Sequence, residues 1–271
     1  MVKARVLLVL LFAVLLAAEA GFGQPQKRTA EAFERYLAST EAVVNQARGG
    51  ASTFLRIESL AAVQRADRVA RLRRGEILIE TVGDTPTRIP GGLIHDWLGT
   101  VFIPGVTVAQ VMGLVQDYDH LTRYYSPDVM QSRLISRQGD DFHVFMRLHK
   151  HKVVTVVLDT EYAVHYGRLN ASHQYSLSRS TRVTEIENPG DPDERPLADG
   201  NDHGFMWRLN SYWAFEQVQD GVFVECEAVS LTRDIPAGLG WLIRPFIESI
   251  PRESLLFTLN ATRSALAAVN H

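Results

Sequence analysis

The sequence is poor in cysteine, and this scarcity is the first limit on its architecture. Cys226 is the single cysteine of 271 residues, so no disulfide can form within the chain. A small secreted domain held together by disulfides is therefore excluded, and the fold must depend on a hydrophobic core. Cys226 alternates with Val222, Val224 and Ala228, so we expect it to be a small buried residue of a β-strand.

An excess of positive charge is also missing. The formal net charge is -3, which gives no electrostatic basis for binding nucleic acid. The sequence contains no nucleophile elbow, zincin, P-loop or dinucleotide-binding motif, and this lowers the expectation of an enzyme without excluding one. His149 and His151 have the spacing of metal ligands on a strand, but no third ligand accompanies them, so we predict no metal and no cofactor.

Only one long hydrophobic run is present, and it lies at the N-terminus. Lys3 and Arg5 precede the segment VLLVLLFAVLLAA, which small residues follow. We interpret residues 1–23 as a signal peptide, cleaved after residue 20 or residue 23. A membrane anchor is the alternative, but the run is shorter than the ~20 apolar residues that span a bilayer. We therefore expect an exported protein, periplasmic or secreted, that is soluble after cleavage.

Residues 24–74 have the apolar spacing of two helices separated by Gly49-Gly50, which predicts an N-terminal helical hairpin. The end of the second helix is rich in arginine, from Arg65 to Arg74. Two interpretations stay open for this cluster. The arginines can form a solvated face near the helix C-terminus, or they can contact anionic lipid head groups as peripheral membrane contacts.

From residue 75 onward most segments alternate apolar and polar residues, as β-strands do. Thr107 is a good N-cap for a helix starting at Val108, and a second short helix follows it. A long amphipathic helix from Ala237 to Val269 closes the chain, with Pro245 and Pro251 expected to kink or divide it. The predicted strands lie at 75–82, 93–103, 129–137, 141–148, 153–166, 172–186, 204–218 and 221–231.

This order of elements resembles the START-like (SRPBCC, helix-grip) superfamily. The segments that carry the resemblance are DYDHLTRYYSPDVMQSRLI and SLTRDIPAGLGWLIRPFIESIPRESLLFTLNATRSAL, and the similar region covers residues 93–269. The resemblance implies an α+β fold over residues 75–271, in which a curved antiparallel sheet wraps a long C-terminal helix. It also implies a largely apolar cavity between sheet and helix, used in the superfamily for lipids, polyketides and other hydrophobic molecules. The superfamily has no universal catalytic signature, so no catalytic residue is transferred.

Aromatic residues are the candidates for the lining of this cavity. Trp207, Leu209, Ser211 and Trp213 alternate along one predicted strand and share a face, although they can also simply pack beneath the helix. We expect the charged strand residues Arg147, Arg179, Arg208, Glu225 and Glu227 to form cross-strand pairs on the opposite, wet face. An arginine that pointed inward would instead bind a carboxylate or phosphate group of a ligand. The candidate ligand-binding residues are Phe145, Tyr162, Trp207, Trp213, Arg208, Trp241, Phe246 and Leu255.

Together these features predict an exported protein that holds a hydrophobic small molecule or lipid, with the pocket opening beside residues 232–240. Two alternatives stay open. One is a cyclase- or hydrolase-like enzyme on the same fold, which would need polar groups that converge in the cavity. The other is an interaction protein that acts through its N-terminal helices. The sequence does not predict an oligomeric state.

Overall fold

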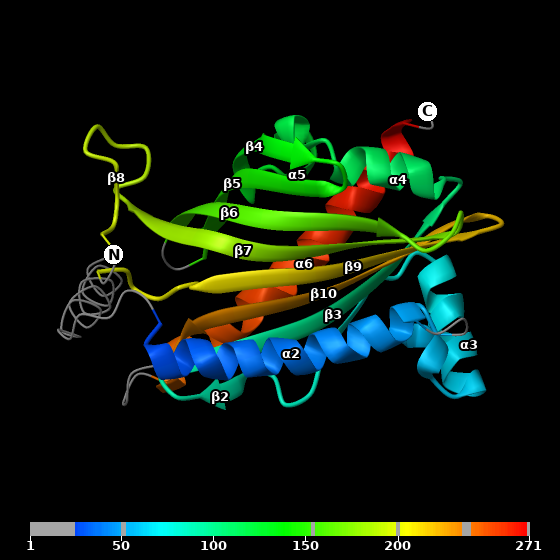
Figure 1. Cartoon of the computed structure of the whole chain (residues 1–271), viewed down its shortest axis with the longest axis horizontal. Helices are drawn as coiled ribbons and strands as arrows, with labels where there is room; N and C mark the ends of the chain where they lie inside the picture. The colour runs from blue at the N-terminus through cyan, green and yellow to red at the C-terminus, as the bar shows by residue number, and fades with distance from the viewer. Residues whose placement is uncertain (1–24, 50–52, 153–154, 199–200, 235–239, 270–271) are drawn as a thin grey trace, which may run out of the picture.

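One large antiparallel β-sheet forms the centre of the protein, and helices lie on both of its faces (Figure 1). The computed structural model describes residues 25–49, 53–152, 155–198, 201–234 and 240–269, and between 240 and 248 it describes the backbone alone. The predicted signal peptide therefore lies outside the described residues, as does most of the predicted opening at 232–240.

The strand order is β1-β3-β10-β9-β7-β6-β5-β4, with β2 paired to β3 and β8 paired to β7. Each of the eight long predicted strands is present, while the short strands β2 and β8 were not predicted. The strands are β1 (Leu78–Thr81), β2 (Thr87–Ile89), β3 (Gly92–Pro104), β4 (Val129–Gln138), β5 (Asp141–His151), β6 (Thr155–Arg168), β7 (His173–Glu187), β8 (Arg195–Pro196), β9 (Arg208–Val218) and β10 (Gly221–Arg233).

Alternation along each strand divides the side chains between two faces of the sheet. In β10, Val222, Val224 and Cys226 share a buried cluster with residues of the C-terminal helix α6. Phe223 belongs instead to a cluster beneath the N-terminal helices. We call the face covered by α6 the inner face, and the face covered by the N-terminal helices the outer face. Cys226 is buried, as the alternation predicts.

The inner face packs against α6 (Gly240–Val269), which crosses behind the strands in Figure 1. Leu255, Leu259 and Leu266 are its buried residues in this core. The short helices α4 (Val108–Val115), η2 (Tyr118–His120) and α5 (Thr122–Tyr125) close one end of the same core. Thr107 caps α4 as predicted, because its hydroxyl accepts a hydrogen bond from the Gln110 amide at 3.3 Å.

The closing helix runs through both of its prolines. Pro245 and Pro251 lie inside the single helix α6, so the chain is not divided into two helices at either position. Side-chain packing along one face is able to maintain a helix that lacks one backbone hydrogen bond.

The outer face packs against α2 (Lys27–Gly49), the turn η1 (Arg56–Ser59) and α3 (Ala62–Arg73). Phe33 and Leu37 of α2 contact one part of the sheet, and Leu72 of α3 belongs to a separate cluster. Both helices of the predicted hairpin are thus present, and they share cores with the sheet. The second helix begins at Ala62 rather than near Phe54, because residues 56–59 form the 3₁₀ turn.

The arginines at the end of α3 are largely paired with acidic side chains. Arg68 pairs with Glu80, Arg71 with Glu76 and Arg73 with Asp220. These contacts fasten α3 to β1 and to the β9–β10 turn. Three of the clustered arginines therefore have acidic partners within the protein itself.

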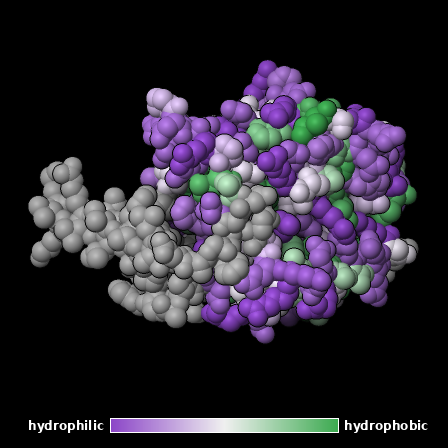
Figure 2. All heavy atoms as spheres, turned by 60° about the vertical axis from the view of Figure 1, so that its left-hand side comes forward, coloured by the Kyte–Doolittle hydropathy of each residue, from purple (hydrophilic) through white to green (hydrophobic). Residues whose placement is uncertain are grey.

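No helix within the described ranges combines the length and apolar character needed to cross a membrane. On the side shown in Figure 2, hydrophobic side chains form separate patches among hydrophilic ones. The order of elements and the helix α6 laid across a curved sheet are those of the helix-grip arrangement. The predicted α+β START-like fold is therefore confirmed.

Candidate functional site

A row of three small side chains and one tryptophan crosses the inner face. Register places Trp97 of β3 beside Ala228 of β10, Ala228 beside Ser211 of β9, and Ser211 beside Ser178 of β7. We call these four residues the inner row. All four are only partly buried, although they lie on the face that α6 covers. Because the side chains on three adjacent strands are short, they fill less space beneath α6 than large residues would, and the inner row is the candidate surface for a small molecule.

Several polar atoms on the inner face are buried without a partner. They are His95 Nδ1, Trp97 Nε1, Ser132 Oγ and Tyr162 Oη. Leaving such a group unpaired costs about 1–3 kcal/mol, so each is a position where a ligand or a water molecule would be stabilised. These atoms can donate or accept hydrogen bonds. They belong to β3, which contributes Trp97 to the inner row, and to β6 and β4, which lie beyond the other end of the row.

Burial also keeps the inner face electrically neutral near these atoms. It lowers the pKa of His95 to about 4, and the other ring nitrogen, Nε2, lies 3.1 Å from Thr232 Oγ1. Burial raises the pKa of Tyr162 to about 12. Both side chains are therefore uncharged at neutral pH. A neutral surface with hydrogen-bonding groups suits an apolar molecule that carries a few polar substituents.

His95 and Tyr162 do not form a single catalytic centre. They lie on β3 and β6, which β10, β9 and β7 separate in the sheet. At about 4.8 Å per strand this corresponds to roughly 19 Å along the sheet. The carboxylates with strongly raised pKa values, Asp96 and Glu225, lie on the outer face. Among the residues that the structure describes, the inner face thus does not bring an acid and a base together at hydrogen-bonding distance from one reacting group.

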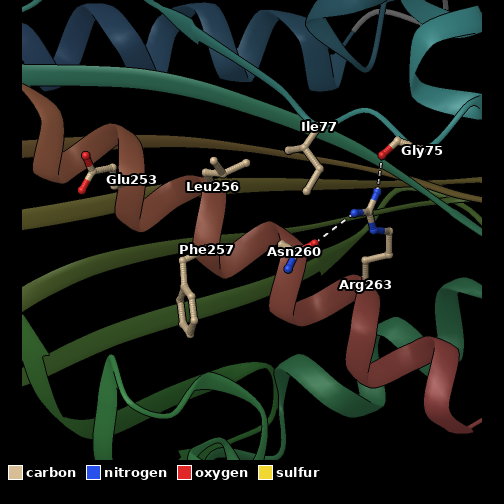
Figure 3. A pocket seen from close by; sticks show the side chains of 7 residues that line it. All are labelled: Gly75, Ile77, Glu253, Leu256, Phe257, Asn260 and Arg263. Carbon is tan, nitrogen blue, oxygen red and sulfur yellow. Dashed lines mark hydrogen bonds between the residues drawn. The ribbon is translucent and has the colours of Figure 1, made fainter.

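A groove of about 450 Å³ lies beside α6, on the side of β1 (Figure 3). Its apolar residues are Ile77, Leu256 and Phe257, and both Ile77 and Phe257 also pack against the inner core. At one end, Arg263 donates hydrogen bonds to Gly75 O at 2.6 Å and to Asn260 Oδ1 at 2.9 Å. Its volume is that of a small-molecule site, and its apolar floor is continuous with the inner core.

Three of the predicted site residues lie on the inner face. Trp213 is partly buried beside the inner row, and Tyr162 is buried with its hydroxyl unpaired. Leu255 is buried in the core between α6 and β3. Their binding of a ligand stays a prediction. Trp241 and Phe246 belong to the part of α6 whose side chains lie outside the described residues.

The other three predicted site residues lie on the outer side. Phe145 is paired in register with Glu161, and the Arg133 guanidinium lies 4.0 Å from its ring centroid. Trp207 packs beneath α2 with Phe33, because it precedes the first residue of β9 and escapes the strand alternation. Arg208 pairs in register with Leu231, a residue of the same outer cluster. These placements correct the expectation that Phe145 and Trp207 line an inner cavity, while Arg208 lies on the outer face where the charged strand residues were expected.

Of the inner row, only Ser211 was on a face predicted to line the cavity, and Trp97, Ser178 and Ala228 were not predicted as site residues. The signal of the row was present in the sequence, since Ser178, Ser211 and Ala228 are small residues at inward positions of otherwise apolar strands. In the described part of the chain, no three His, Cys, Asp or Glu side chains come together as a metal site requires.

No protein-family model and no curated protein match this sequence. Solved structures are similar to it in fold, at low sequence identity. A STAR-related lipid transfer protein fragment from Xanthomonas axonopodis is 18% identical, with a TM-score of 0.46 over 70% of this chain and 98% of the other. A START superfamily protein from Mycobacterium smegmatis is 10% identical, with a TM-score of 0.46 over 65% and 99%. The Zhui aromatase/cyclase from a Streptomyces species is 9% identical, with a TM-score of 0.46 over 66% and 96%.

Proposed function

We propose that this chain is an exported, non-enzymatic binding protein that holds a hydrophobic small molecule or lipid on the inner face of its sheet, beneath α6. The observation that carries the proposal is the inner row, a partly buried strip of small and aromatic residues bordered by unpaired polar atoms. A START-like fold suggests either ligand binding or cyclase-like activity, and the fold alone does not choose between them.

The placement of the titratable groups favours binding over catalysis. His95 and Tyr162 are neutral and far apart on the inner face, and the ionisable carboxyls Asp96, Glu225 and Glu227 point to the other side. Acid–base chemistry needs groups that converge on one bond with pKa values near the working pH. Holding a ligand needs only apolar area and a few hydrogen bonds, which the inner face offers.

Native mass spectrometry of protein purified from its own compartment tests the proposal directly. We expect a bound molecule that organic solvent extracts. In a second assay, a fluorescent fatty acid and a fluorescent phospholipid serve as probes. Protein that is repeatedly empty, and that also fails to shield both probes from water, would contradict the proposal.

A pair of matched variants locates the site. Ser211→Phe adds a large ring in the middle of the inner row and is expected to weaken probe binding at least ~10-fold, because the ring occupies the ligand's place. Ala163→Phe adds the same ring at an exposed position of β6 on the outer side and is expected to leave affinity unchanged. Equal loss of binding in both variants, or in neither, would show that the ligand does not lie on the inner row.

Export is supported by the charged start and apolar run of the first 23 residues. The mature protein is expected to begin at residue 21 or residue 24. Intact-mass measurement of the protein recovered from the host's exported fraction distinguishes the two. Recovery of the full 271-residue mass in the cytoplasmic fraction alone would contradict export.

A further inference from the structure

Three carboxyl groups are buried together on the outer face of the sheet, beneath the N-terminal segment. They are Asp96 of β3 and Glu225 and Glu227 of β10, exposed by 1%, 6% and 3% respectively. We call them the outer acid cluster. Cross-strand pairs on a wet face were the expectation for the two glutamates, but α2 and η1 cover them. Buried carboxylates are rare unless they are paired, so the cluster needs partners.

The partners come from outside the long strands, from α2 and η1. The backbone amide of Arg56 donates to both carboxylate oxygens of Glu225 at 3.1 Å, and its guanidinium donates to Glu227. The hydroxyl group of Tyr36 in α2 donates a hydrogen bond to Asp96 Oδ2 at 2.9 Å. The cluster therefore connects the sheet to the segment that lies over it.

The partners do not balance the charge. The one guanidinium among these partners, that of Arg56, donates to Glu227 alone, and two oxygens, Asp96 Oδ1 and Glu227 Oε1, are buried without a partner. A cavity of about 40 Å³ beside Glu225 and Glu227 has room for a few water molecules but not for an organic ligand.

The surrounding charged groups do not supply the missing cations. Arg48 of α2 lines the same cavity, but its guanidinium lies 3.9 Å from the centroid of the Tyr175 ring, and no ion pair joins it to the cluster. Glu41 pairs with Arg179 and accepts a hydrogen bond from Tyr212. Other ionisable groups near the cluster or its neighbours are Glu58 of η1, Glu216 of β9 and His173 of β7. On the other side, Leu98 of β3 lies in register between Glu227 and Glu80 of β1, and Glu80 is paired with Arg68 of α3.

Protons bound to the carboxyl groups can neutralise the excess negative charge of the cluster. Burial, followed by the negative charge of Glu227, raises the pKa of Asp96 to about 7. Burial also raises the pKa of Glu225 to about 7, against the opposing effect of Arg56. Burial raises the pKa of Glu227 too, while Arg56 lowers it. A protonated Asp96 can donate a hydrogen bond to Glu227, which would satisfy one of the unpaired oxygens.

We propose that the outer acid cluster is a pH-sensitive latch, which fastens α2 and η1 to the outer face while it holds protons and loosens them as it ionises. An exposed carboxyl releases its proton near pH 4, whereas the buried carboxyls retain theirs to about pH 7. A raised carboxyl pKa means that the docked state binds more protons than the open state. Docking is thus strongest below about pH 4 and weakens as the pH rises to about 7.

Hydrogen–deuterium exchange at pH 5.5, 7.0 and 8.5, corrected for the intrinsic exchange rate, tests this on the unaltered protein. Each carboxyl whose pKa moves from about 4 to about 7 on docking makes the opening constant about 30-fold larger at pH 8.5 than at pH 5.5. We expect that increase in the amides of 27–49 and 56–59, with no comparable change in β6 and β7. Equal pH dependence of these helices and of β6 and β7 would overturn the proposal.

Two isosteric variants remove the cluster's charge. In Asp96→Asn and Glu225→Gln we expect the pH dependence of α2 and η1 exchange to fall by about 30-fold each, and in the double variant we expect only the contribution of Glu227 to remain. Asp84→Asn, at an exposed position of the turn before β2, serves as the matched control and is expected to behave like the unaltered protein. Unchanged pH dependence in the double variant would also overturn the proposal.

Discussion

Gly99 lies at a close approach of α6 to the sheet, and replacing it by alanine tests the helix-grip packing. A Cβ atom on this inward residue of β3 would lie 2.5 Å from Leu259 Cδ1 and 3.0 Å from both Leu255 Cγ and Ile79 Cδ1. Leu259 is fully buried and Leu255 is 4% exposed, so neither side chain can turn away into solvent. The added methyl group must therefore move the helix or force these side chains from their preferred rotamers.

We expect Gly99→Ala to destabilise the protein by about 1–3 kcal/mol, the usual cost of overpacking a filled core. For a chain of this size that corresponds to a fall in Tm of roughly 2–12 °C. Urea and thermal denaturation followed by circular dichroism measure both values. Gly113→Ala is the control, because Gly113 is exposed in α4 with no atom within 4 Å of a built Cβ. This change is expected to stabilise by about 0.5–1 kcal/mol, since alanine favours a helix.

A coupling measurement separates overpacking from an effect on the strand itself. Leu259→Ala removes the side chain that the new methyl group would meet, and alone it is expected to cost about 2–5 kcal/mol. The double variant should cost less than the sum of the two single changes by at least ~0.5 kcal/mol. Additive costs, or a Gly99→Ala variant as stable as the original protein, would refute the close approach of α6 to β3.

Three further predictions concern buried side chains. Tyr125→Phe removes the hydrogen bond between the tyrosine hydroxyl and Thr262 Oγ1 at 2.8 Å and is expected to cost about 0.5–1.5 kcal/mol in urea denaturation; a cost near zero would argue against this bond. Cys226, which is buried with a raised thiol pKa, should react with a thiol reagent at least ~10³-fold more slowly in the folded protein than in urea, and rapid native labelling would contradict its burial. Because burial lowers the pKa of His95 to about 4, its contribution to stability is present above about pH 6.5 and lost as the pH falls toward 4. His95→Gln should therefore reduce the loss of stability between pH 6.5 and 4.5, and an unchanged slope would show that another group controls it.

The sheet could be predicted from the sequence because its strands are long and alternate regularly. In β10 the inward residues Val222, Val224 and Cys226 are apolar and small enough to pack beneath a helix, and their period of two is unambiguous. The closing helix was recognised from its apolar stripe. Its continuity through Pro251 was not, because local preference opposes it and tertiary packing decides.

The site was predicted less well, for reasons that individual residues explain. Phe145 and Tyr162 are both buried aromatics, but register places them on opposite faces, and register depends on long-range pairing. Trp207 lies one residue before β9, where alternation no longer applies. For Glu225 and Glu227 alternation identified the correct face, but the covering segment comes from residues about 170 positions earlier in the chain.

The pairing of β3 with β10 also constrains the order in which the protein can fold. These strands pair along 13 residues, from Gly92 with Arg233 to Pro104 with Gly221. Until β10 is available, β1 and β3 have no connection to the six-element meander that follows them, and the edges of both parts stay unpaired. Such distant contacts make folding slow. A chain with this topology therefore cannot complete its central sheet until β10, at residues 221–233, has been synthesised.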